Sequence, residues 1–172
     1  MKIFFKDVIT MKVGIGQDSH RFDSNNTTKK LILGGVTIPN HMPLLGNSDA
    51  DVILHSITNA ISGITCVNIL GSIADDMCQS GKTDSSAYLI RALSYLNPSY
   101  AISHISISIE CKTPKLAPYI DDIRNNLSKL LNIPTSSIGI TATSGEGLTD
   151  FGKGLGIQVF SIVTACPNHS QS

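Results

Sequence analysis

AISHISISIEC, residues 101–111, carries the clearest secondary-structure signal in this chain. Between Ile105 and Ile109 isoleucine alternates with serine, and a period of two is typical of a β-strand with one buried face. We therefore expect a strand over residues 101–111 whose isoleucine side chains pack against a core.

Further signals on both sides of this strand indicate a mixed fold. Runs rich in β-branched residues predict strands over residues 12–17, 31–33, 36–38, 137–143 and 155–164. Apolar residues that recur at intervals of three and four predict helices over residues 50–65, 85–96 and 118–131. Ser48 and Asp51 resemble a capping box that starts the first helix. The pattern predicts a single α/β (α+β) domain with one mixed sheet of about four to five strands and about three helices.

Length and composition fit one domain. The chain has 172 residues, of which 41% are hydrophobic and 15% charged, and this excludes a disordered protein. We expect the domain to span residues 11–165, with residues 1–10 as an N-terminal extension and residues 166–172 as a loose C-terminal tail. The low charge also fits a subunit whose faces are buried in an assembly.

Charge and hydropathy exclude several partners. Thirteen Lys and Arg balance thirteen Asp and Glu, so no basic surface favours nucleic acid or an anionic membrane. No apolar run reaches the roughly 20 residues of a membrane span, and Lys6 and Asp7 interrupt the opening segment before a signal-peptide core can form. The cysteines lie far apart without a CxxC motif. We therefore expect a cytoplasmic protein.

Three residues have the chemistry of a metal site. Asp18 and His20 lie two residues apart at the end of the first predicted strand, so an extended backbone points both side chains to one side. His55 lies roughly opposite the apolar stripe of the first predicted helix and faces a polar space. One carboxylate and two imidazoles can hold a catalytic zinc ion with an open fourth position. The same spacing also fits two surface histidines and an aspartate that caps a turn.

Two loops could bind phosphate. TATSGEG, residues 141–147, joins a predicted strand to a loop whose hydroxyl and backbone N–H groups could hold oxyanions. Lys153 would add positive charge, and Glu146 could hold Mg²⁺ together with substrate phosphates. KTPKL, residues 112–116, places two lysines around a proline in a rigid turn. Both segments also fit ordinary solvated loops. No GxSxG, P-loop or GxGxxG motif is present, which argues against nucleophilic serine chemistry and dinucleotide binding.

Five ordered blocks resemble one family of enzymes. The blocks are GIGQDSHRF at 14–22, LGGVTIP at 33–39, NSDADVILH at 47–55, KTPKLAP at 112–118 and ITATSGEGL at 140–148. Together they resemble the 2-C-methyl-D-erythritol 2,4-cyclodiphosphate synthase family over about residues 11–165.

The resemblance implies a homotrimer with active sites at the subunit interfaces, in the non-mevalonate route to isoprenoids. The substrate would be 4-diphosphocytidyl-2-C-methyl-D-erythritol 2-phosphate. Its 2-phosphate would attack the β-phosphorus, expel CMP and close 2-C-methyl-D-erythritol 2,4-cyclodiphosphate. An ionised phosphate is already a nucleophile, so this phosphorus–oxygen lyase needs positioning and charge neutralisation more than a strong base.

The resemblance also implies a role for each site residue. Asp18, His20 and His55 would hold Zn²⁺, and Glu146 would help to hold Mg²⁺ or Mn²⁺ that bridges the substrate phosphates. Ser144 and Asn47 stand at catalytic positions, and Ser144 would donate a hydrogen bond to the transition state. The residues implied to bind substrate are Asp18, His20, Asn47, Ser48, Gly71, Asp76, Cys111, Thr113, Pro114, Lys115, Leu116, Ala117, Thr143, Ser144, Gly145, Glu146 and Lys153.

Several positions depart from the family pattern. Asn47 stands where a His usually contacts substrate phosphate, and an amide cannot carry positive charge. Asn59 replaces an Asp one turn after the zinc-binding His, and Ile69 replaces an acidic residue that contacts a substrate hydroxyl. Lys153 replaces an Arg, which keeps the charge but loses the planar fork. These changes surround the diol side of the site and spare the metal side.

Two alternatives stand beside the cyclase. A zinc phosphoesterase would hydrolyse a nucleotide substrate and bring solvent oxygen into the product. A catalytically impaired relative would keep the metal and the trimer and act as a scaffold.

Overall fold

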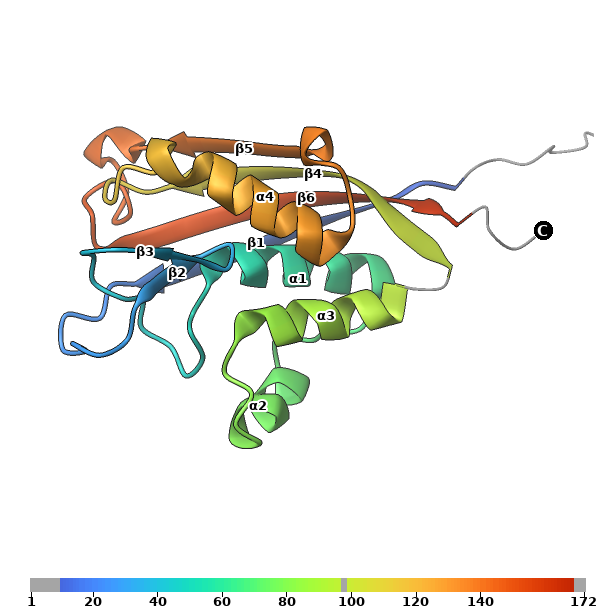
Figure 1. The fold of residues 1–172 in the computed structure, drawn as a ribbon, viewed down its shortest axis with the longest axis horizontal. Helices are drawn as coiled ribbons and strands as arrows, with labels where there is room; N and C mark the ends of the chain where they lie inside the picture. Colours follow the sequence, from blue (N-terminus) through green and yellow to red (C-terminus); the bar gives the residue numbers. More distant parts are fainter. Residues whose placement is uncertain (1–9, 97–98, 169–172) are drawn as a thin grey trace, which may run out of the picture.

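In the computed structural model, which describes residues 10–96 and 99–168, four strands form the central sheet. Their order is β1 (Lys12–Arg21), β6 (Gly156–Pro167), β4 (Tyr100–Glu110) and β5 (Ile138–Thr143) (Figure 1). The β1–β6 and β6–β4 pairs are antiparallel, and β4 pairs parallel with β5. The carboxyl ends of β1, β4 and β5 therefore lie at the same end of the sheet.

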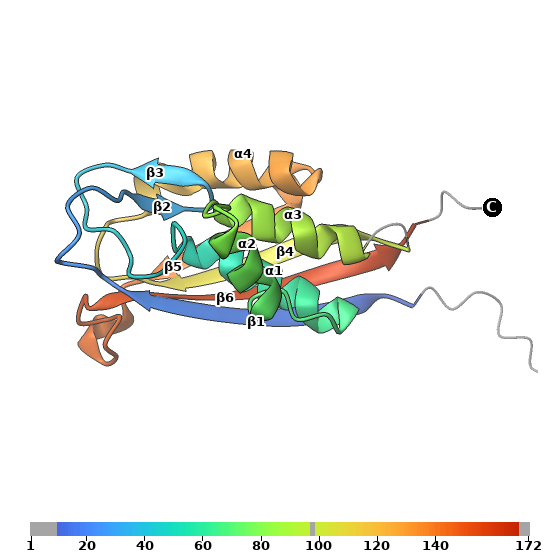
Figure 2. The same cartoon turned by 90° about the horizontal axis from the view of Figure 1, so that it is seen from below.

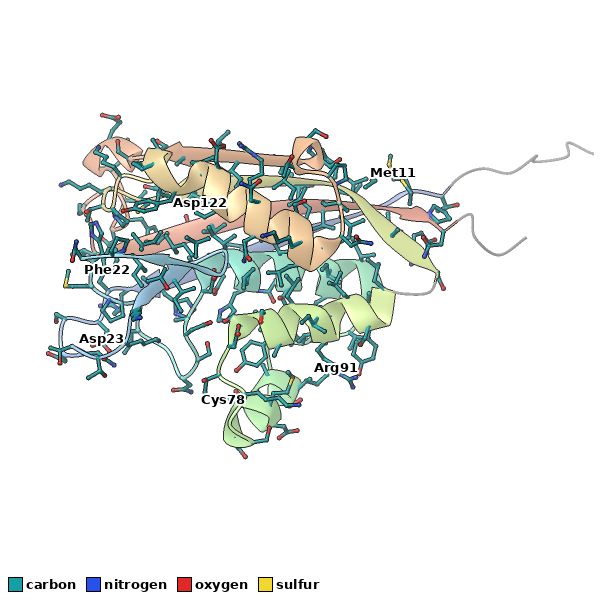
Figure 3. All side chains as sticks on the ribbon, in the orientation of Figure 1. Met11, Phe22, Asp23, Cys78, Arg91 and Asp122 are labelled. Atoms are coloured by element: carbon teal, nitrogen blue, oxygen red, sulfur yellow. The ribbon has the colours of Figure 1, made fainter. Side chains whose placement is uncertain are left out.

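The helices cover one face of this sheet. They are α1 (Val52–Thr65), α2 (Ser72–Gln79), α3 (Ser85–Leu96) and α4 (Ile120–Leu131). Figures 1 and 2 together show that these helices lie on the same side as a small two-stranded sheet, β2 (Leu31–Leu33) with β3 (Val36–Ile38). Side chains fill the space between the sheet and the helices (Figure 3). The predicted α+β domain and its mixed sheet are confirmed.

Two details of the predicted fold need correction. Residues 31–33 and 36–38 form a separate sheet, because they pair with each other and with no strand of the central sheet among the residues that the structure describes. The short helix α2 was not expected, and none of its residues is fully buried. A helix with so little buried apolar surface has only a weak periodic signal in the sequence.

β4 has the predicted alternation of buried and exposed residues, but the alternation is interrupted between Ile102 and Ile105. Ile105, Ile107 and Ile109 are buried, while the serines between them are exposed. A register shift between Ile102 and His104 marks a bulge in the pairing with β6. A bulge inserts one extra residue into a strand, and Ile102 can therefore face the core together with Ile105.

α1 packs directly on the backbone of β1 at two glycines. A Cβ atom on Gly14 would lie 2.1 Å from the Ala60 carbonyl oxygen, and one on Gly16 would lie 1.9 Å from the Ser56 carbonyl oxygen. Only glycine permits this separation. Gly14 and Gly16 are buried against α1, while Ile15 between them points to the uncovered face of the sheet and is 67% exposed.

Asp51 fixes the start of α1. Its carboxylate accepts hydrogen bonds from the backbone N–H groups of Ile53 and Leu54 and, across the chain, from those of Gly34 and Gly35. The predicted capping box with Ser48 is therefore wrong: Asp51 is the N-cap, and the helix begins at Val52 rather than at residue 50. One buried carboxylate thus joins the β2–β3 turn to the first helix.

The chain ends only partly overlap the described residues. Residues 1–9 of the predicted extension and residues 169–172 of the predicted tail lie outside them. Strand β6 runs through Pro167, two residues into the segment predicted as a loose tail, and the Asn168 N–H donates to the Ser99 carbonyl at 3.0 Å. Within the described part of the chain, no helix has the length and apolar character needed to cross a membrane.

Substitution of Gly16 tests the close packing of α1 on β1. We expect Gly16→Ala to lower the free energy of unfolding by about 2 kcal/mol or more, because the new methyl group overlaps helix backbone. Gly63→Ala is the control, since a Cβ there meets only the Ile15 carbonyl oxygen at 3.8 Å and alanine favours a helix interior over glycine by about 1 kcal/mol. Urea unfolding followed by circular dichroism measures both variants, and equal stability of the two would contradict the packing.

Candidate functional site

β1 and α1 bring three potential metal ligands together. The Asp18 Oδ2 atom lies 3.0 Å from His20 Nε2 and 3.0 Å from His55 Nδ1, and the two imidazole nitrogens are 3.4 Å apart. All three ligating atoms lie within 4.8 Å of one another. The prediction that Asp18 and His20 share one side of the strand and meet His55 from the first helix is confirmed.

A backbone carbonyl orients the His20 ring. The His20 Nδ1 atom lies 2.8 Å from the Leu45 carbonyl oxygen, which can only accept, so Nδ1 donates to this carbonyl and Nε2 is the nitrogen that faces Asp18 and His55. Lys29 holds the loop that contains this carbonyl, because its Nζ donates to the carbonyls of Leu44 at 2.9 Å and Gly46 at 3.3 Å. The first histidine is therefore fixed from outside the cluster.

A second helix orients the His55 ring. The Nε2 atom of His55 lies 2.8 Å from the Ser85 hydroxyl oxygen at the start of α3. Ser85 in turn donates its hydroxyl and its backbone N–H to the Asp49 carboxylate. His55 Nδ1 is then the nitrogen that faces Asp18.

These contacts fit a bound metal ion. Each histidine turns one nitrogen toward the carboxylate and anchors the other nitrogen on a partner outside the cluster, which is the usual arrangement around a metal-ligating imidazole. Two nitrogens and one oxygen form a donor set that suits zinc with one position left for a substrate or water. His55 is 8% exposed, and the cluster is thus shielded on the helix side.

Charge in the cluster shifts the pKa of two groups. Burial alone would raise the pKa of Asp18, but hydrogen bonds from His20 and His55 and their positive charge outweigh it and hold the pKa of this carboxyl well below its usual range. Burial alone would lower the pKa of His20, but the hydrogen bond to the Asp18 carboxylate and its negative charge raise that pKa above its ordinary value. Asp18 is therefore an anion at neutral pH and attracts a cation.

The cluster opens into a hollow of about 390 Å³ between β1, α1, α2 and α3. Asn47, Ser48 and Gly71, all predicted from the sequence to bind substrate, lie on its wall. Asp75 also lines it, whereas the predicted Asp76 is exposed on α2 and does not. Ile69 is buried in the core and is 1% exposed.

A second hollow, of about 330 Å³, combines the two predicted phosphate-binding loops. The Cys111 N–H donates to the Thr143 carbonyl at 2.9 Å and so joins them where β4 and β5 end. Ser144 Oγ donates to Glu146 Oε1 at 3.2 Å next to this hollow. The predicted residues that line it are Cys111, Pro114, Lys115, Leu116, Ala117, Thr143 and Ser144.

Three other predicted residues lie near this second hollow without lining it. Thr113 lies inside the first loop and accepts a hydrogen bond from the thiol of Cys111, and Gly145 and Glu146 directly follow Ser144. Burial raises the pKa of the Cys111 thiol to about 12, so this thiol stays protonated and is no nucleophile. Lys153 is exposed, and its Nζ lies 3.3 Å from the Asp150 carboxylate.

The two hollows lie at opposite edges of the sheet. β1 carries Asp18 and His20 on one edge, and β5 leads to Ser144 and Glu146 on the other. Three strand spacings separate these edges, which is about 14 Å. Within one chain, the structure therefore does not bring Glu146 to the Asp18 cluster.

Several residues around the metal cluster were not predicted from the sequence. Asp49 and Ser85 position His55, and Asp75, Cys78 and Tyr88 line the first hollow. Four of these five belong to α2 and α3, which are distant from Asp18 in the sequence and come close to the cluster only when the chain folds. No local sequence motif predicts that contact.

The fold and the cluster define an α+β protein with a three-ligand metal site at the edge of a mixed sheet. The chain matches the model of the YgbB family over residues 11–166 and therefore belongs to that family.

Similar proteins carry one name. A Chlamydia abortus protein is 50% identical over 154 residues, and one from Chlamydia caviae is 49% identical over the same length. Each alignment covers 89% of this chain and 88% of the relative, and both relatives are named 2-C-methyl-D-erythritol 2,4-cyclodiphosphate synthase.

Solved structures share the fold. The bifunctional IspDF from Campylobacter jejuni has a TM-score of 0.83 at 28% identity, and the match covers 93% of this chain and 43% of that longer chain. The CDP complex of IspF from Plasmodium falciparum has a TM-score of 0.80 at 28% identity, and the match covers 95% of this chain and 100% of that one.

The raised pKa of His20 predicts how pH acts on metal binding. A metal ion must displace the proton from His20, so the apparent zinc affinity should fall by about tenfold per pH unit once the pH drops below that raised pKa. The stability of the metal-free protein should change in the opposite sense. The ion pair with Asp18 stabilises it fully below about pH 6.5, the ordinary pKa of His, and this stabilisation is lost as pH rises through the raised pKa.

Zinc competition titrations and thermal melts between pH 5 and pH 9 would measure both effects. An apparent zinc affinity that stays constant over this range would show that no ligand proton is displaced.

Proposed function

We propose that this protein converts 4-diphosphocytidyl-2-C-methyl-D-erythritol 2-phosphate to 2-C-methyl-D-erythritol 2,4-cyclodiphosphate and releases CMP, in the non-mevalonate route to isoprenoid precursors. The observation that carries this proposal is the convergence of Asp18, His20 and His55 in a member of a family whose relatives bear the name of that enzyme. We infer that the reaction takes place in the cytoplasm, as the sequence predicts.

The metal cluster would hold the phosphate that reacts. We infer that Asp18, His20 and His55 hold Zn²⁺, which when bound would supply Lewis acidity toward a phosphate oxygen. Asn47 and Ser48 lie on the wall of the same hollow and can donate hydrogen bonds to that phosphate. Such contacts position an ionised phosphate that needs no general base.

The second hollow would hold the cytidine part of the substrate. Most residues on its wall are apolar, and Lys115, which also lines it, can contact a phosphate. When substrate is bound, the Ser144 hydroxyl would turn from Glu146 and donate its hydrogen bond toward the charge that develops on the leaving phosphate. Glu146 is exposed beside Ser144, and we infer that it helps to hold Mg²⁺ or Mn²⁺ between the two phosphates of the cytidyl diphosphate. Lys153 adds positive charge on the same loop.

A complete site would need two copies of the chain. The two hollows face different edges of one sheet, so a neighbouring copy can bring its second hollow to the metal cluster. The face of the sheet without helices also carries apolar side chains that a neighbour would cover, and four of them are 43% to 67% exposed: Val13, Ile15, Phe160 and Ile162. We infer the homotrimer that the sequence resemblance implies.

Labelled water separates the cyclase from its alternatives. We would incubate the protein with the cytidyl diphosphate substrate, Zn²⁺ and Mg²⁺ in ¹⁸O-water and analyse the products by phosphorus NMR and mass spectrometry. The cyclase yields CMP and an unlabelled cyclic diphosphate, because no solvent oxygen enters. Labelled linear phosphates would instead identify a zinc phosphoesterase, and tight binding of zinc and substrate without turnover would identify an impaired relative.

We infer that Asp75 contacts the substrate diol. It lines the first hollow, while Ile69, where the family has an acid, is buried. We expect Asp75→Asn to raise KM about tenfold, since a hydrogen bond to a charged group contributes about 1.5–3 kcal/mol. Asp76→Asn on the same helix is the matched control and should leave KM unchanged. Equal effects of the two substitutions would remove Asp75 from the binding site.

A further inference from the structure

We propose that Ser85 and Asp49 are positioning residues of the metal centre, and that their hydrogen bonds fix the His55 ring with Nδ1 toward the ion. This relay runs from His55 Nε2 to the Ser85 hydroxyl and on to the Asp49 carboxylate. The inference rests on the proposed zinc site, and it is tested by zinc affinity and by the position of the His55 proton, neither of which depends on turnover.

The direction of each hydrogen bond follows from what the partners can donate. An ionised Asp49 carboxylate has no proton to give, so the Ser85 hydroxyl must donate to it. With its only proton directed at Asp49, the Ser85 oxygen can only accept from His55 at 2.8 Å. Nε2 of His55 must then carry a proton, and Nδ1, which lies 3.0 Å from Asp18 Oδ2, is the nitrogen left to bind a metal when its own proton is displaced.

Backbone contacts hold the relay itself in place. The Ser85 N–H donates to Asp49 Oδ2 at 3.1 Å, the Asp49 N–H donates to the Thr83 carbonyl at 2.9 Å, and the Asp51 N–H donates to Asp49 Oδ1 at 3.2 Å. The Ser85 residue is fully buried. Water therefore has little access to the bond between Ser85 and His55, and the ring has one favoured orientation.

The relay also distinguishes the two histidines chemically. His20 donates its outward proton to a neutral backbone carbonyl, that of Leu45. His55 donates toward a carboxylate through one hydroxyl, and such carboxylate partners fix the orientation of metal-ligating imidazoles. Loss of such an outer partner usually weakens metal binding by about 10-fold to 100-fold.

Ser85→Ala is the direct test. It removes one oxygen at a buried position and leaves His55 Nε2 without an acceptor, so both tautomers of the ring become accessible. We expect the zinc dissociation constant of the full-length protein, measured by competition with a chromophoric chelator, to rise by about 10-fold to 100-fold. Ser86→Ala is the matched control, because Ser86 is the next residue of α3 and contacts Asp84 through its backbone N–H, which the substitution keeps.

Asp49→Asn gives a second variant and a readout of the tautomer. If the amide oxygen accepts from the Ser85 N–H, the amide NH₂ faces the Ser85 hydroxyl and turns its proton toward His55. We expect ¹⁵N NMR of the zinc-loaded protein to place the His55 proton on Nε2 in the wild type and to show a reduced share of protonated Nε2 in Asp49→Asn. A purely structural role for Asp49 would change thermal stability and leave the tautomer unchanged.

Each outcome decides the proposal. Weaker zinc binding in Ser85→Ala with normal binding in Ser86→Ala, at matched circular dichroism, supports the relay. Zinc affinity within twofold of wild type in Ser85→Ala overturns it, as does an equal loss in both variants. If Ser85→Ala does not fold, the tautomer in Asp49→Asn decides alone. Failure of the cyclase assay with these zinc effects intact would count against the proposed function and not against the relay.

Discussion

The contact between the backbones of β1 and α1 is the constraint on which the site depends. Gly14 and Gly16 leave no Cβ atom between strand and helix, and the helix backbone approaches closely enough for His55 to reach the strand. The period of two then places Asp18 and His20 on the same face, two and four residues beyond Gly16. Thus one short strand segment supplies both the packing surface for the helix and two of the three ligands.

Local patterns predicted much of this protein, and long-range contacts account for the rest. Alternation in residues 105–109 and the apolar spacing in residues 52–64 were sufficient for the strand and helix that carry the core. The spacing of Asp18 and His20 predicted their common side. Ser85 was not predictable, because it reaches His55 only after α3 packs beside α1, and nothing in its local sequence signals that contact. The bulge in β4 and the polar helix α2 also lack a local signal.

The departures from the family pattern have an uneven distribution around the site. The three ligands at one edge of the sheet keep their outward hydrogen bonds, and the loop at the other edge keeps Ser144 and Glu146, for which we propose roles toward metal and phosphate. On the opposite wall of the first hollow, Asn59 donates to the Gln17 carbonyl at 3.0 Å, and α2 offers Asp75. We therefore infer that contacts to the substrate diol are rearranged on α2, while the chemistry at phosphorus is kept.

Anomalous diffraction at the zinc absorption edge, from crystals grown with Zn²⁺, would show whether Asp18, His20 and His55 hold the ion together. We expect one strong peak per subunit, about 2.0–2.2 Å from Asp18 Oδ2, His20 Nε2 and His55 Nδ1. No peak at these three atoms, or coordination through His55 Nε2 instead of Nδ1, would contradict this expectation.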